Sequence, residues 1–390
     1  TITPPGFLFC SMLIINANKG GFLVNKLFES YQIGPVTYRN RFVRSATQDW
    51  LCGSDGFVSA AQLELYKNLA VGGVGLIITG HSYVSHPLGR AALHQNGIFN
   101  EKFVEGYKRL VDTVQQQGAK IFLQLNHAGR QTIPDNTEGL MPVAPSDRFD
   151  EKGQQVARAL TLDEIERIKE DFEAAALRAK RAGFDGVQVH VAHGYLLAQF
   201  LSPFTNNRQD EYGGSMEQRT ALPAEIAYRV KAAVGKQFPV YAKLNTTDGV
   251  AGPVQLSMAE AVYAAQMLEA HGVSALETSG GTVKENRLVM AKPGILKPEQ
   301  EAYFAPAAKQ IRAAVKIPIL LVGGMRSVDV MESLIEEGTA DMLSLSRPFV
   351  REPALVNQLA AGQTKATCVS CNACFNPEGL MCRYAGPSLQ

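Results

Sequence analysis

The stretch HVAHGY at residues 190–195 places two histidines three residues apart and a tyrosine two residues further on, where an apolar run ends. Imidazole and phenol groups donate hydrogen bonds and transfer protons, so His190, His193 and Tyr195 are candidate catalytic residues. Two histidines could also bind zinc, although a third ligand at a familiar spacing is lacking. They could instead be core histidines whose polar atoms are paired. The elements that position them distinguish these interpretations.

A second group of chemically active residues lies near the end of the chain, where four cysteines have the spacing C-x2-C-x2-C-x7-C: Cys368, Cys371, Cys374 and Cys382. Four thiolates can ligate a [4Fe-4S] cluster or a structural zinc ion, or they can remain free thiols. A secreted protein would spread its cysteines over the fold as disulfides, so this clustering favours a reducing, cytoplasmic location.

The elements around these residues repeat one unit. From residue 41 onward, short β-branched runs alternate with segments of helical period eight times. The expected strands are 41–47, 74–80, 120–126, 184–190, 239–245, 274–280, 317–324 and 340–346. Apolar strands in such even units predict a parallel sheet closed into a (β/α)8 TIM barrel. An open doubly wound sheet is the alternative, but no GxGxxG follows the first strand.

The sequence divides into three parts. Residues 1–24 are interpreted as a leader, disordered or vector-derived, because they are apolar and fit no periodic element. Residues 25–360 form the barrel, with a β-hairpin expected over 31–40 around Gly34 and Pro35. Residues 361–390 form a short Cys-rich tail.

The bulk composition is that of an ordinary globular protein. Hydrophobic residues make up 46% of the chain, and 38 basic against 37 acidic residues leave a net charge of +1. This balance argues against a nucleic-acid-binding surface. No run of 18 apolar residues is present, so no transmembrane helix is expected.

The active site of such a barrel lies at the C-terminal ends of its strands, which carry a second set of polar and small residues. Gly323, Gly324 and Arg347 stand where these barrels commonly bind a phosphate. The amide of Gln124 and the charge of Lys243 suit a heterocycle with an imide edge, such as a reduced flavin. A buried lysine could instead be a Schiff-base nucleophile.

Four stretches together resemble the old yellow enzyme family of FMN-dependent ene-reductases: HVAHGYLLAQFLSPFTNNRQDEYGGSMEQR, LQLNHAGRQT, LVGGMRS and LSLSRPFVREP. The resemblance covers roughly residues 25–360. Within that family, the chain is most similar to the branch that includes the barrel domain of 2,4-dienoyl-CoA reductase.

The resemblance implies FMN at the barrel mouth. Ala46 and Thr47 would contact the isoalloxazine ring through their backbone, and Gln124 would bond its pyrimidine edge. Lys243 stands where many relatives carry arginine and would stabilise negative charge at N1 and O2, as a point charge. Gly80, at the end of the second strand, is grouped with the cofactor-binding residues. The phosphate would be held by Gly323, Gly324, Ser346 and Arg347.

The resemblance also implies catalytic roles. His190 and His193 would donate hydrogen bonds to the carbonyl oxygen of an enone-type substrate, and Tyr195 would deliver a proton to its α-carbon. The long segment 128–160 would cover the site as a loop and set specificity.

These residues predict an NAD(P)H-dependent FMN oxidoreductase that reduces the activated C=C bond of an α,β-unsaturated carbonyl compound. One alternative is a barrel subunit of an iron–sulfur flavoprotein complex, dienoyl-CoA-reductase-like or demethylase-like, whose cysteine tail meets an electron-transfer partner. Another is a flavin-free barrel, either a Schiff-base lyase that uses Lys243 or a non-catalytic binding protein. A homo-oligomer is compatible with all of them.

Overall fold

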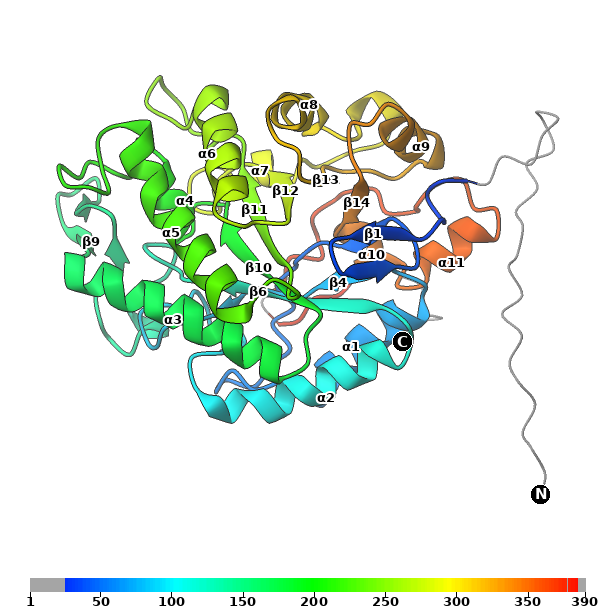
Figure 1. Ribbon diagram of the computed structural model, residues 1–390, viewed down its shortest axis with the longest axis horizontal. Helices are drawn as coiled ribbons and strands as arrows, with labels where there is room; N and C mark the ends of the chain where they lie inside the picture. Colours follow the sequence, from blue (N-terminus) through cyan, green and yellow to red (C-terminus); the bar gives the residue numbers. More distant parts are fainter. Residues whose placement is uncertain (1–24, 377, 385–390) are drawn as a thin grey trace.

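Eight parallel strands close into a barrel in the computed structural model, which describes residues 25–376 and 378–384 (Figure 1). They are β3 (Phe42–Arg44), β4 (Leu76–Ile78), β6 (Lys120–Asn126), β10 (Gly186–Val191), β11 (Val240–Asn245), β12 (Ala275–Ser279), β13 (Ile319–Val322) and β14 (Met342–Leu345). Each pairs with its neighbours along the chain, and β14 pairs with β3 to close the ring. The predicted (β/α)8 barrel is therefore confirmed. The predicted leader lies outside the described residues.

Helices form the outer layer around these strands (Figure 1). The longer ones are α1 (Ala60–Val71), α2 (Val104–Gln115), α3 (Leu162–Arg181), α5 (Met216–Val234), α6 (Met258–Ala270), α8 (Ala305–Ala314) and α9 (Val328–Glu336). Several of them begin with a capping box. In α3, the Thr161 side chain accepts the backbone N–H of Glu164, and the Glu164 carboxylate accepts the backbone N–H of Thr161. Gly183, just beyond α3, has φ +90°, a conformation that glycine adopts without strain.

The expected hairpin closes the barrel floor. It consists of β1 (Tyr31–Ile33) and β2 (Val36–Tyr38), joined at Gly34 with φ +56°. Its apolar side packs into the barrel interior, where the Tyr38 and Tyr241 hydroxyls lie 2.7 Å apart. The floor is thus sealed by buried side chains, and the opposite end of the barrel is left for a site.

Residues 128–160 differ from the expected loop, because they contain a three-stranded sheet of β7 (Val143–Ala144), β8 (Arg148–Phe149) and β9 (Gln155–Ala159). Strands of two to five residues are too short to show alternation in the sequence. The short elements β5 (Ser82–Tyr83), α4 (Leu196–Leu201), α7 (Arg287–Met290), α10 (Arg347–Arg351) and α11 (Leu355–Ala360) complete the loops. Among the described residues, no helix is long and apolar enough to cross a membrane.

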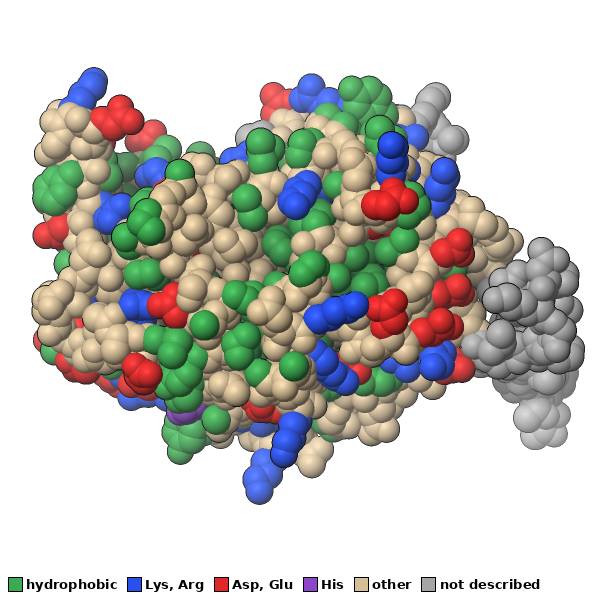
Figure 2. All heavy atoms as spheres, turned by 90° about the horizontal axis from the view of Figure 1, so that it is seen from above, with side chains coloured by type: hydrophobic (Ala, Val, Ile, Leu, Met, Phe, Trp, Pro, Cys, Tyr) green, Lys and Arg blue, Asp and Glu red, His purple; other side chains and the backbone are tan. Residues whose placement is uncertain are grey.

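Charged side chains of both signs are interspersed over the described residues of the face seen in Figure 2. This distribution agrees with the near-zero net charge of the chain.

Candidate functional site

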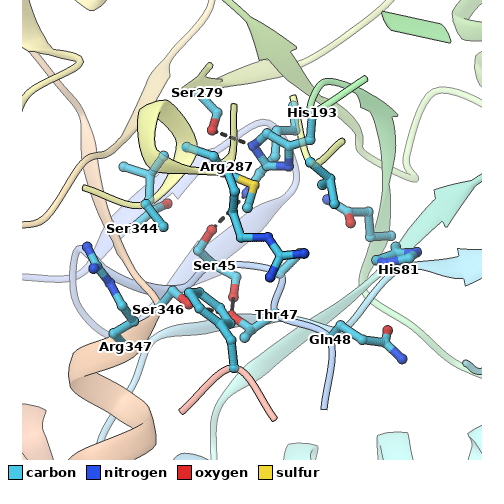
Figure 3. Close-up of a pocket in the computed structure, with 18 of the residues that line it drawn as sticks. Ser45, Thr47, Gln48, His81, His193, Ser279, Arg287, Ser344, Ser346 and Arg347 are labelled. Carbon is cyan, nitrogen blue, oxygen red and sulfur yellow. Dashed lines mark hydrogen bonds between the residues drawn. The ribbon is translucent and has the colours of Figure 1, made fainter. Parts of the chain in front are cut away.

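A cavity opens at the C-terminal ends of the strands and brings together most of the residues predicted from the sequence (Figure 3). Its walls include Ala46, Thr47, Gln124, His190, His193, Tyr195, Lys243, Gly324, Ser346 and Arg347. Gly80 and Gly323, which were also predicted to bind the cofactor, are not among the residues that line the cavity. A Cβ at Gly80 would lie 3.0 Å from the Thr47 carbonyl, and the Gly323 carbonyl accepts the backbone N–H of Tyr303. These two glycines support the wall through close backbone packing.

A buried polar network lies beneath the cavity and contains Glu277, which is fully buried. Lys243 Nζ lies 3.2 Å from the Glu277 carboxylate and donates to Ser45 Oγ at 2.8 Å. Glu277 also accepts from Ser45 and from the Gln188 amide, at 2.6 and 2.8 Å. Because Nζ is held by the Glu277 carboxylate and by Ser45, Lys243 is poorly placed to act as a Schiff-base nucleophile.

The same carboxylate orients two amides in series. Glu277 can only accept, so Gln188 turns its Nε2 toward it and presents its Oε1 to Gln124 Nε2 at 2.7 Å. The sequence analysis missed Glu277 and Gln188. Both are polar residues in the middle of apolar strands, and this was the available signal.

The histidine pair and the tyrosine face one another across one part of the cavity. The His190 ring centroid lies 5.1 Å from those of both His193 and Tyr195. His193, with φ +62°, is held by Ser279 Oγ at 2.7 Å from Nε2 and by Asn245, which accepts its backbone N–H. His190 Nδ1 is buried and has no hydrogen-bond partner among the described residues. An unpaired buried nitrogen argues against a satisfied core histidine.

Burial keeps these groups uncharged. It lowers the pKa of His190 and His193 well below the usual value, and Lys243 lowers both further. It raises the pKa of Tyr195 to about 12. Two neutral imidazoles and one protonated phenol therefore face the cavity at neutral pH. In the described part of the chain, no group of three or more His, Cys, Asp or Glu residues could hold a metal ion, so the zinc interpretation gains no support.

The opposite side of the cavity carries Arg347, and Arg287 extends between the two sides (Figure 3). Arg347 Nη1 donates to the Lys292 carbonyl at 2.8 Å and to Asn372 Oδ1 at 2.6 Å. The Ser346 and Thr47 hydroxyls lie 2.7 Å apart beside it. Among the described lining residues there are three cationic side chains and no carboxylate. Arg287, which the sequence analysis did not identify, has no ion-pair partner there.

The Cys-rich tail forms part of this wall, since Ser370 and Phe375 line the cavity. Cys368 and Cys374 are buried, Cys371 is exposed, and none of the described cysteines forms a disulfide. Burial raises the pKa of Cys368 and Cys374, which favours the thiol form. Within the part of the chain that the structure describes, the cysteines do not form a group that could hold a metal ion.

Comparison with known proteins relates this geometry to a flavoenzyme family. The family model described as NADH:flavin oxidoreductase / NADH oxidase matches residues 26–366. An NADH oxidase of Thermoanaerobacter brockii is 39% identical over 89% of this chain and 52% of that protein. A 4,4'-dithiodibutanoate disulfide reductase of Rhodococcus erythropolis is 33% identical over 90% of this chain and 92% of that protein. The chain thus spans about half the length of the first relative and nearly all of the second.

Solved structures give the same result. A 2-naphthoyl-CoA reductase complex superimposes with a TM-score of 0.80 at 28% identity, over 88% of this chain and 54% of the other. An old yellow enzyme homologue from Zymomonas mobilis superimposes with a TM-score of 0.73 at 28% identity, over 88% and 95% of the two chains.

Proposed function

Because the chain belongs to the NADH:flavin oxidoreductase / NADH oxidase family of FMN-dependent, NAD(P)H-dependent oxidoreductases, we propose that it reduces the activated C=C bond of an α,β-unsaturated carbonyl compound. The observation that carries this substrate class is the trio of His190, His193 and Tyr195, all uncharged and facing one cavity. Neutral donors of this kind suit an oxygen on which negative charge develops.

The residues present fit FMN. The oriented amide of Gln124 and the ammonium of Lys243 offer hydrogen bonds and positive charge to an imide edge. At the other side, Ser346, Gly324 and Arg347 offer donors to a phosphate. The hydrogen bonds that Arg347 donates to Lys292, Ser370 and Asn372 all use Nη1, which leaves the N–H groups on Nε and Nη2 for a ligand. When bound, FMN supplies the hydride that passes from NAD(P)H to the alkene.

The chain's own residues would activate the alkene and complete the reduction. His190 and His193 would donate to the substrate carbonyl oxygen, which polarises the conjugated C=C bond. If His193 donates through Nδ1, its Nε2 must accept the hydroxyl hydrogen of Ser279, which lies 2.7 Å away. Tyr195 would then give its proton to the α-carbon.

The cavity also favours a substrate that carries an anionic group, because Arg287 projects into it and no carboxylate lines it among the described residues. The R. erythropolis relative is named as a reductase of 4,4'-dithiodibutanoate, a carboxylate.

We expect Arg287→Gln to lower kcat/KM for 4-oxo-2-pentenoate about tenfold relative to its methyl ester, because one charge-assisted hydrogen bond is lost. Equal losses for the acid and the ester would contradict an anion-binding role.

The four tail cysteines remain a proposed [4Fe-4S] or zinc site, and an electron-transfer partner would accompany a cluster. The described residues do not assemble such a site, so no reaction step is assigned to it. Analysis of the purified protein for iron, acid-labile sulfide and zinc tests the proposal.

The visible spectrum tests the proposed function directly. The purified protein is expected to be yellow, to lose its flavin bands when NAD(P)H is added without oxygen, and to recover them when an enone follows. The reduced alkene should appear in equal amount to the enone consumed. A protein that takes up no FMN, or whose reduced flavin no enone reoxidises, would contradict the proposal.

A further inference from the structure

The hydroxyl of Tyr195 has one hydrogen-bond partner among the described residues, His81, a histidine that the proposed function does not use. His81 follows β4 by three residues, and its Nε2 lies 3.2 Å from Tyr195 Oη. The two ring centroids are 4.8 Å apart, and both side chains line the cavity. Which of the two atoms donates depends on the ring nitrogen of His81 that carries the hydrogen.

A neighbouring amide determines which ring nitrogen of His81 carries the hydrogen. The Oε1 atom of Gln95 accepts the backbone N–H of Ala91 at 2.7 Å, and a backbone N–H can only donate. The other end of the Gln95 amide, Nε2, therefore faces His81 Nδ1, at 2.7 Å. Asn126 Nδ2 approaches the same ring nitrogen at 3.2 Å. With N–H donors directed at it, Nδ1 must be the acceptor nitrogen of the ring.

The hydrogen of His81 is consequently on Nε2. Burial lowers the pKa of His81 to about 4, so the ring is neutral at physiological pH and carries only this one hydrogen. Nε2–H then donates to the Tyr195 oxygen. The hydroxyl hydrogen of Tyr195 cannot point back at His81, and so it is free for a different acceptor.

We propose that His81 is a positioning residue for the proton transfer: it holds Tyr195 as a donor whose hydrogen faces the cavity, and it stabilises the phenolate that the transfer leaves behind. The inference rests on the proposed function. In the step, the Tyr195 O–H bond breaks and a C–H bond forms at the α-carbon of the enolate. The electron pair of the O–H bond stays on the phenolate oxygen, which water later reprotonates.

The surroundings of Tyr195 leave this task to His81. His190 is a neutral neighbour with a ring centroid 5.1 Å away, and Arg287 is the charged group whose field offsets part of the rise that burial causes in the pKa of Tyr195. Neither donates a hydrogen bond to the Tyr195 oxygen in the described residues. The short path from Ala91 through Gln95 and His81 thus links a fixed backbone group to the hydroxyl that would donate the proton.

The experiment compares substitutions at His81 in the FMN-loaded protein that differ in their hydrogen-bonding groups. His81→Phe keeps a ring but removes the N–H, and we expect the reoxidation of dithionite-reduced flavin by cyclohexenone to slow about tenfold. The deuterium isotope effect in D2O on this step should increase, because proton transfer becomes slower. His81→Gln places an amide N–H close to the former Nε2 and should recover most of the rate. His94→Phe, an exposed histidine of the same segment, is the matched control and should retain the full rate.

The outcomes separate the inference from the proposed function. A normal rate in His81→Phe, or a loss that Gln does not recover and that leaves the isotope effect unchanged, would overturn the role of His81. If Tyr195→Phe is slow while His81→Phe is normal, the proposed function stands and only the inference fails. If no enone reoxidises the flavin of the unsubstituted protein, the proposed function fails and the inference falls with it.

Discussion

Replacing His190 and His193 together by alanine is expected to slow the reoxidation of reduced flavin by an enone at least a hundredfold while the protein stays yellow. Removal of one preorganised donor to a developing oxyanion typically costs about 10²- to 10³-fold in rate. His190 is buried and His193 is half-buried, and both are uncharged and directed at one cavity, so water replaces them poorly. Neither belongs to the residues proposed to hold the cofactor phosphate.

Stopped-flow absorbance of the flavin band measures this step. The flavin should be reduced with dithionite rather than NAD(P)H, because the nicotinamide would use the same cavity. The variant His86→Ala/His271→Ala removes two histidines that do not line the cavity and serves as the matched control. A loss smaller than threefold in the His190/His193 variant would show that another group polarises the carbonyl. Loss of the yellow colour would show that the pair retains FMN instead.

The sequence predicts which side chains share one cavity where their placement depends on position along a strand. The eight strands, each with its C-terminal residues, were recognisable from periodicity, and a parallel barrel places all those ends on one rim. His190, Gln124, Lys243 and Arg347 therefore met as expected, although nothing in their spacing along the chain brings them together.

Contacts between residues that are distant along the chain could not be predicted from the sequence. Glu277 pairs with Lys243 because β11 and β12 are adjacent with these two residues in register. Asn372 reaches Arg347 only because the tail folds back over the barrel mouth. The tautomer of His81 follows from Gln95, fourteen residues away in an irregular loop. Such contacts are set by tertiary packing, which local patterns do not encode.

Replacing Lys243 by methionine is expected to destabilise the protein strongly, because it leaves the Glu277 carboxylate buried without its cation. Both side chains are almost completely buried, at 3% and 0% exposure, and their charged groups lie 3.2 Å apart. Removing one partner of a buried ion pair typically costs about 3–5 kcal/mol. The same substitution removes the charge proposed to stabilise the reduced flavin, so it should also weaken FMN binding and slow flavin reduction.

The double variant Lys243→Met/Glu277→Gln separates the two effects. A glutamine at position 277 is neutral and still accepts a hydrogen bond from Gln188 or Ser45, so most of the lost free energy of unfolding should return. Denaturant unfolding of the FMN-free proteins measures this recovery without a contribution from cofactor binding. The rate of flavin reduction by NAD(P)H should stay low in the double variant, because no cation is restored. Equal losses of stability in the single and double variants would show that the unpaired Glu277 charge is not the cause.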